Sequence, residues 1–150
     1  NILLRLVDET DEKHTTIERV IGELKHAGHN LHIVPQTMHE YWVVATRPRE
    51  NNGLGINADH AFKTVEQYCK TFTMLPDDAS LFNQWIQLIK TFNVIGKAAH
   101  DARIVAAMDS HHITHILTLD AGDFTRYTHV TLLSPDHLKN SGLIAANDEH

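Results

Sequence analysis

The sequence predicts an α/β fold, and three observations lead to this prediction. Short apolar segments, each suited to a β-strand, occur at residues 31–34, 72–75, 115–119 and 130–133. Segments with helical periodicity precede the first strand, at residues 13–27, and lie between the others, at residues 37–46, 58–70, 78–91 and 98–110. No linker, repeat or low-complexity segment interrupts the series. Because alternating strands and helices usually form a parallel sheet with helices on both faces, we predict one domain with a central parallel sheet.

The predicted helices depend on the positions of their apolar and capping residues. Segment 13–27 has one apolar face, formed by Ile17, Val20, Ile21 and Leu24. Gly28 follows this segment and suits the backbone conformation that ends many helices. Asn57 precedes segment 58–70 and is a favourable N-cap. Segment 78–91 is expected to direct inward the side chains of Leu81, Trp85, Leu88 and Ile89.

Two segments fall outside the regular elements. Residues 47–56 contain Pro48, Gly53 and Gly55 and are predicted to form a loop. Residues 136–150 are polar and are predicted to form a peripheral tail, which leaves residues 1–135 as the folded domain.

The composition is that of an ordinary globular domain, with 42% hydrophobic and 21% charged residues. The apolar runs are too short for a transmembrane helix, and no signal peptide is visible, so no membrane partner is expected. Cys69 is the only cysteine, which excludes an internal disulfide and favours a cytoplasmic location. The net charge of −6 excludes nucleic-acid binding through a generally basic surface. A metal ion and local Arg or Lys would have to attract a phosphate backbone.

Four acidic residues lie where predicted strands end or predicted helices begin. Asp101 opens a helix, Asp120 and Asp123 follow a strand, and Glu40 lies about one turn into the helix after the first strand. In α/β folds the carboxyl ends of strands and the adjacent helix starts line one crevice. Carboxylates that meet there repel one another unless a cation neutralises them. The four acids therefore predict a site for Mg²⁺ or Mn²⁺, the chemistry that phosphodiester hydrolysis needs.

Each acid also has a purely structural interpretation. Residues 37–40 match a capping box, in which Thr37 begins the helix and Glu40 reaches back to it. Asp101 suits the positive end of a helix dipole, and Asp120 and Asp123 suit a turn around a glycine. These roles do not exclude metal binding, and the shared location of the four acids favours it.

Basic residues near the acids are candidates for contacts to phosphate. They are Arg47, Lys97 and Arg103, and ordinary solvated charges are the alternative interpretation. Loop 51–55 is a candidate substrate contact, with a simple turn as the alternative.

The histidines do not indicate a zinc site. His111, His112 and His115 lie close in sequence but lack the H-E-x-x-H spacing, and the chain has one cysteine. We interpret them as surface residues. His100, beside Asp101, is either a neighbour of the metal ligands or simple core or surface filling.

Several blocks of the sequence resemble PIN-domain proteins, most closely the VapC-like toxins of toxin–antitoxin pairs. They are TMHEYWVVATRP with NNGLG, then GKAAHDARIVAAM, then ITHILTLDAGDFTRY, followed by a last strand with Pro135. The resemblance covers roughly residues 1–135, in order and with suitable spacing. GKAAHDAR and the LTLDAGDF block are its most specific parts.

The resemblance implies a three-layer α/β/α fold and a Mg²⁺- or Mn²⁺-dependent endoribonuclease. The acidic cluster of the family corresponds to Glu40, Asp101 and Asp120, with Asp123 adjacent. Asn1 would match an Asn at the start of the family pattern, and Thr118 would match a polar residue near the site. The implied partners are an RNA substrate, a small antitoxin that covers the acidic crevice, and a second copy of the chain.

The resemblance has one departure, at Asn1. The first metal-binding Asp of the family lies two residues before its Asn, and this sequence contains neither that Asp nor most of the central strand around it. Residues 2–7 are then expected to form the first helix. Either the sequence is a fragment or the chain begins here. In the second case fewer acids hold the metal and neighbouring strand edges are unpaired, so we expect lower stability and activity than in a chain extended upstream.

Three functions remain open at this point. The main hypothesis is a metal-dependent RNA endonuclease. The second is a module that keeps the fold and binds a partner protein or RNA without cutting, which the absent first acid favours. The third is a DNA-directed nuclease of the same fold. Dependence on a divalent cation separates the first from the second, and substrate preference separates the first from the third.

Overall fold

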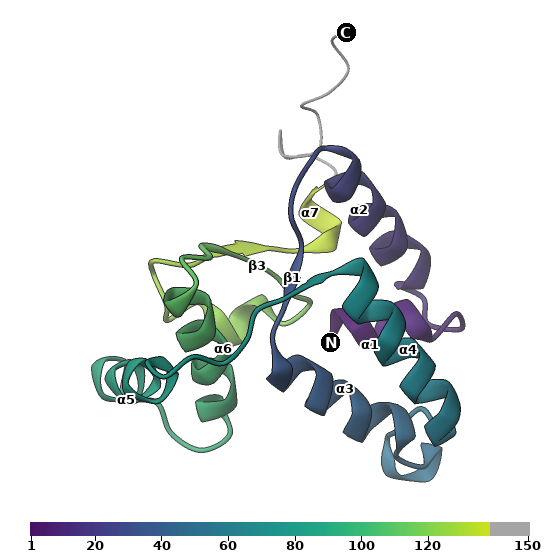
Figure 1. Ribbon diagram of the computed structural model, residues 1–150, viewed down its shortest axis with the longest axis horizontal. Coiled ribbons are helices and arrows are strands. Elements are labelled where there is room, and N and C mark those ends of the chain that lie inside the picture. The colour runs from purple at the N-terminus through teal and green to yellow at the C-terminus, as the bar shows by residue number, and fades with distance from the viewer. Residues whose placement is uncertain (139–150) are drawn as a thin grey trace, which may run out of the picture.

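The computed structural model describes residues 1–138 of the chain. They form a mixed architecture in which helices predominate and the strands are short and parallel (Figure 1). Residues 139–150, most of the predicted polar tail, lie outside the described residues.

The elements follow one another largely as the sequence predicts. The first half of the chain contains α1 (Ile2–Val7), α2 (His14–His26), β1 (His32–Ile33), α3 (Pro35–Thr46), the 3-10 helix η1 (Arg49–Asn51), α4 (Ala58–Thr71) and β2 (Thr73–Met74). The second half contains α5 (Leu81–Thr91), α6 (Ala98–Ser110), β3 (His115–Leu117), the 3-10 helix η2 (Ala121–Phe124), β4 (Thr131–Leu133) and α7 (Pro135–Leu138).

The strands form two separate parallel pairs in residues 1–138, and this part of the chain does not join them into one continuous sheet. Strand β1 pairs with β2, with His32 opposite Thr73. Strand β3 pairs with β4, with His115 opposite Thr131. The parallel direction is as predicted. Segments 31–34 and 114–118, which contain β1 and β3, line a common cavity.

Two main apolar cores correspond to the two strand pairs. One core joins α5 and α6 to the segments around β3 and β4, through side chains such as Leu88, Val105 and Tyr127. The other joins α1, α3 and α4 to β1 and β2, through side chains such as Tyr41 and Tyr68. In Figure 1, α5 and α6 lie to one side of β1, and α1, α3 and α4 lie to the other. Apolar burial therefore stabilises two lobes that meet at the cavity.

Helix α1 is attached to the second core by a specific hydrogen bond. The hydroxyl of Tyr68 on α4 donates to the carbonyl oxygen of Leu3 at 2.6 Å. The ring of Tyr68 also packs edge-on against Tyr41, with a centroid separation of 5.4 Å. The prediction that residues 2–7 form a helix is thus confirmed, and this helix has a fixed position beside α3 and α4.

Helix ends confirm most of the capping predictions and correct one. Gly28 follows α2 with a φ of +84°, and Asn57 caps α4 by accepting from the backbone N–H of His60 at 2.9 Å. Helix α3, however, begins at Pro35, because proline suits the first helical position. Thr37 then lies inside the helix, where its hydroxyl donates to the carbonyl of Val34. The predicted capping box between Thr37 and Glu40 is therefore wrong.

Two further segments bear on the predicted layout. Loop 47–56 requires Gly53, because a Cβ there would collide with the backbone carbonyl of Arg47. Residues 136–138, assigned by sequence to a polar tail, belong to α7, where Leu138 is 1% exposed and packs with Val20 and Leu24. Among residues 1–138, no helix is both long enough and apolar enough to cross a membrane.

Candidate functional site

The two lobes enclose a cavity of about 680 Å³. Its walls include the strand segments 31–34 and 114–118, together with apolar side chains such as Ile104 and Met108. Its polar residues include Asn1, Thr118 and the four predicted acids Glu40, Asp101, Asp120 and Asp123. The sequence therefore places its candidate acids on one concave surface. Clefts of this kind, with a few convergent polar groups, are where small ligands and substrates usually bind.

Three elements bring the four acids to the cavity. Glu40 lies in α3, directly after the segment of β1, and Asp101 lies in the first turn of α6. Asp120 precedes η2 and Asp123 lies within it, both after β3. The carboxyl ends of β1 and β3 thus both lead to the acids, as the sequence predicts for parallel strands.

Asp101 is the most perturbed acid of the site. Burial raises the pKa of its carboxyl group above the ordinary value, and the negative charges of Asp123 and Glu40 raise it further. Positive charge at His100 and at Arg126 acts in the opposite direction. Asp101 is therefore a half-buried carboxyl group that two other carboxylates repel, the condition in which a bound cation gives the largest electrostatic gain.

Asp120 belongs to a separate hydrogen-bonded group at the edge of the cavity. Nδ2 of Asn1 donates to Oδ2 of Asp120 at 2.6 Å and to the hydroxyl of Thr118 at 3.2 Å. The Thr118 hydroxyl also accepts from the backbone N–H of Asp120 at 3.1 Å. Thr118 is buried, whereas Asn1 and Asp120 are exposed. Asn1 and Thr118 therefore lie beside the acids, and their hydrogen bonds hold Asp120.

The structure distinguishes Asp120 from Asp123. The charge of Asp123 acts on Asp101, whereas Asp120 accepts a hydrogen bond from the side chain of Asn1. Asp123 rather than Asp120 is therefore the electrostatic neighbour of Asp101.

Three predicted phosphate contacts do not face the cavity. Arg103 is bound on both sides, by Asp77 at 2.6 Å and by the side-chain oxygen of Gln36 at 3.1 Å. Arg47 donates to the carbonyl of Asn52 and supports the loop after α3. Lys97 precedes α6 and is exposed. None of the three lines the cavity, and the guanidinium group of Arg103 is engaged by Asp77 and Gln36.

The histidines lie mostly at the surface, as predicted. His112 and His115 are exposed on the cavity rim, and His111 binds the carbonyl of Pro76 through Nε2 at 2.7 Å. His100 is exposed next to Asp101, and its positive form lowers the pKa of that carboxyl group.

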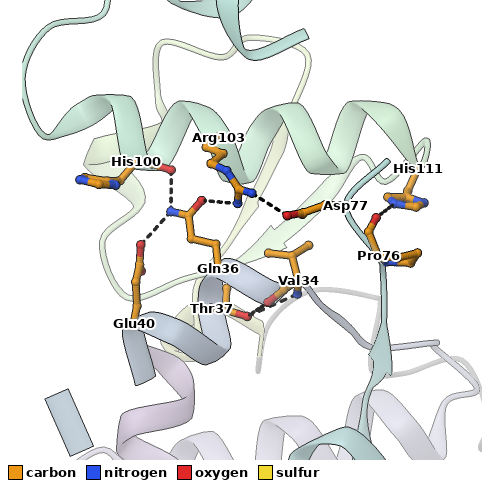
Figure 2. A network of polar contacts seen from close by, with 9 residues as sticks. All are labelled: Val34, Gln36, Thr37, Glu40, Pro76, Asp77, His100, Arg103 and His111. Atoms are coloured by element: carbon orange, nitrogen blue, oxygen red, sulfur yellow. Dashed lines mark hydrogen bonds and ion pairs between the residues drawn. The ribbon is translucent and has the colours of Figure 1, made fainter. Parts of the chain in front are cut away.

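Two residues of this site were missed by the sequence interpretation. Gln36 donates to Oε1 of Glu40 at 2.7 Å (Figure 2), and Arg126 supplies positive charge near Asp101. Gln36 could have been found because it precedes Glu40 by four residues, so both lie on one face of a helix. Arg126 follows Asp123 closely in sequence, but only the three-dimensional arrangement brings it near Asp101.

The oxygen ligands at the site suit a hard divalent cation, but the acidic side chains are widely spaced. Carboxylate oxygens and a hydroxyl group are the ligands that Mg²⁺ and Mn²⁺ prefer. Within residues 1–138, however, no three Asp, Glu, His or Cys side chains lie close enough together to hold one ion. The acids share a surface and interact through their charges, but they do not form a closed ligand set.

No protein-family model matches this chain, and a search of curated proteins finds no match.

Proposed function

We propose that this protein is a metal-dependent endoribonuclease with a PIN-like, three-layer α/β/α fold, similar to VapC-like toxins. The observation that carries the proposal is the environment of Asp101. Its carboxyl group is half-buried in a cavity wall, and the carboxylates of Asp123 and Glu40, which come from two other elements, raise its pKa. Folding against this repulsion is costly, and a bound divalent cation would remove the cost.

The residues in and near the cavity would have the following roles. Glu40, Asp101 and Asp123 would hold Mg²⁺ or Mn²⁺, with Asp120 at the edge. The metal, when bound, supplies an activated water and neutralises charge on the phosphate. Asn1 and Thr118 orient Asp120 by hydrogen bonds. Arg126 does not line the cavity, but its charge acts on Asp101, and it would supply positive charge for the phosphate backbone.

Cleavage of a mixed RNA pool with Mn²⁺ or with chelator tests this proposal. Asp101→Asn is expected to abolish metal-dependent cleavage, because it removes the central carboxylate at almost constant size. The matched control is Asp109→Asn, which changes an acid of the same helix that pairs instead with His129. Cleavage that persists in Asp101→Asn, or that is lost equally in both variants, would contradict the proposal.

The second candidate function is a module of the same fold that binds RNA or protein without cutting. The open spacing of the acids favours this candidate, because no three of them meet at ligand distances within residues 1–138. RNA binding that is unaffected by chelator, with no cleavage in Mn²⁺, would support it. A preference for single-stranded DNA over RNA in the same assay would instead indicate the DNA-directed nuclease.

The resemblance also suggests protein partners, namely an antitoxin and a second copy of the chain. Exposed apolar side chains are compatible with such contacts, including Val43 and Phe62 on α3 and α4 and Phe82 on α5. Size-exclusion chromatography with light scattering tests the proposed homodimer.

A further inference from the structure

Gln36 is a buried polar side chain that connects the two helices carrying Glu40 and Asp101. It lies in the first turn of α3 and is 7% exposed. Its Nε2 donates to Oε1 of Glu40 at 2.7 Å and to the backbone carbonyl of His100 on α6 at 2.9 Å. Its Oε1 accepts from Nη1 of Arg103 at 3.1 Å (Figure 2). All the polar atoms of this amide are therefore in use.

The surrounding groups define the orientation of the Gln36 amide. Two acceptors, a carboxylate and a carbonyl, face its nitrogen, and a guanidinium donor faces its oxygen. A flipped amide would place oxygen against oxygen and nitrogen against nitrogen, which loses all three hydrogen bonds. The donor side of Gln36 is thus directed at Glu40.

An ion pair fixes this arrangement from the other side. Nη2 of Arg103 binds Oδ2 of Asp77 at 2.6 Å, in the segment that follows β2. The guanidinium group is planar, so binding at Nη2 also orients the Nη1 that Gln36 accepts from. Three segments of the chain, namely α3, α6 and the segment after β2, therefore determine the position of one amide.

This position has a direct consequence for the acids. The carbonyl group that Gln36 contacts belongs to His100, the residue immediately before Asp101. The same nitrogen contacts the carboxylate of Glu40. Gln36 therefore fixes the position of the Glu40 carboxylate relative to the start of α6, the helix that carries Asp101. It engages one oxygen of Glu40 and makes no hydrogen bond to the other.

We propose that Gln36 is a positioning residue, which holds the Glu40 carboxylate in the orientation that binds the divalent cation. This inference rests on the proposed function. Groups that hydrogen-bond to a metal ligand commonly change metal affinity by about 10- to 100-fold when they are removed. A loss in that range is expected for a variant that cannot donate to Glu40.

The test measures binding of Mn²⁺ alone, by electron paramagnetic resonance titration, to the full chain. Gln36→Met keeps the length of the side chain and removes both hydrogen-bonding groups. The matched control is Gln84→Met. Gln84 lies on α5, donates to the hydroxyl of Ser80 at the start of that helix, and does not line the cavity. Gln36→Met is expected to lower Mn²⁺ affinity about 10- to 100-fold, and Gln84→Met is expected to leave it unchanged. Melting temperatures without metal report the purely structural cost of each substitution.

The outcomes separate this inference from the function on which it rests. If Gln36→Met binds Mn²⁺ with wild-type affinity and Asp101→Asn does not bind it, the proposed role of Gln36 is overturned and the proposed metal site is supported. Equal losses in Gln36→Met and Gln84→Met would show a general effect on folding and would also overturn it. No Mn²⁺ binding by the unaltered chain would overturn both proposals.

A second variant covers the case in which Gln36→Met does not fold. Arg103→Met removes the donor that orients Gln36 and leaves the bond from Gln36 to Glu40 in place. It is expected to lower Mn²⁺ affinity in the same direction, by less than 10-fold. Unchanged affinity in a folded Arg103→Met protein would overturn the network as the device that positions Glu40.

Discussion

The two sides of the acidic cavity differ in how strongly the surrounding structure restrains their carboxylate groups. Glu40 and Asp101 lie in regular helices, and Glu40 is bound by the buried amide of Gln36. Asp120 and Asp123 lie in or beside the short 3-10 helix η2 and, like Glu40, are exposed. The hydrogen bond that Asp120 receives comes from the exposed side chain of Asn1.

This difference shows how one site can combine precision with adaptability. Ligands on helices with buried support are preorganised, because packing and hydrogen bonds restrict their rotamers. Ligands on exposed turns can move toward a cation at little cost. Under the proposed function, the α3–α6 side would define where a metal binds, and the η2 side would move toward it.

The comparison predicts unequal losses when either side is changed. Glu40→Gln is expected to lower Mn²⁺-dependent RNA cleavage by roughly 100-fold or more, exceeding the usual effect of a group that only contacts a ligand. Asp120→Asn is expected to cost less, because its amide can still accept from Asn1. Single-turnover cleavage rates at saturating metal measure both. Larger loss in Asp120→Asn would reverse the assignment of the two sides.

The apolar part of the same cavity gives a prediction about stability. Strands β1 and β3 each pair with one neighbour within residues 1–138, and both line the cavity. A short apolar, strand-forming segment fused ahead of Asn1 is expected to raise the melting temperature, because it would give these edges a partner. Each 1 kcal/mol gained corresponds to about 2–4 °C for a protein of this size.

The control for this experiment is the same segment with prolines at alternate positions, which cannot donate hydrogen bonds to a sheet. Calorimetry of the two fusions compares them directly. Equal melting temperatures would contradict the idea that the cavity walls are available strand edges.

The smallest expected effect concerns the charge of Asp101 in the metal-free protein. Burial and the neighbouring acids raise its pKa in the folded state. Folding therefore favours the protonated form, and this stability, present at acidic pH, is lost as the pH rises through the raised pKa. Asp101→Asn is thus expected to increase the melting temperature slightly at pH 7 without metal and to flatten its decline as the pH rises above the ordinary aspartate pKa of about 4. A lower melting temperature at pH 7 would show that the ionised carboxylate is stabilising.

Much of this architecture could be predicted from sequence because local patterns determine it. The apolar face of α2 and the Asn57 cap of α4 are encoded within a few residues, and Asp101 lies where helix α6 begins. The grouping of acids followed from the general geometry of strand ends. The start of α3 differs from the prediction because Pro35 occupies the first helical position, which places Thr37 inside the helix and not at its N-cap.

Other features depend on contacts between distant segments and carry little local signal. The guanidinium of Arg103 finds Asp77 and Gln36 only after α3, α6 and the segment after β2 have packed together. Arg126 approaches Asp101 in the same way. The separation of the strands into two pairs also depends on tertiary structure. The sequence of a short strand does not show whether one or both of its edges are paired.

The most direct test of the central claim is a crystal structure of the full chain with Mn²⁺, examined for anomalous scattering. We predict one strong peak in the cavity with carboxylate oxygens of Glu40 and Asp101 among its ligands, at about 2.0–2.6 Å, and with η2 drawn toward it. Electron density that leaves these two acids without a metal, in crystals that diffract well and contain saturating Mn²⁺, would contradict the account.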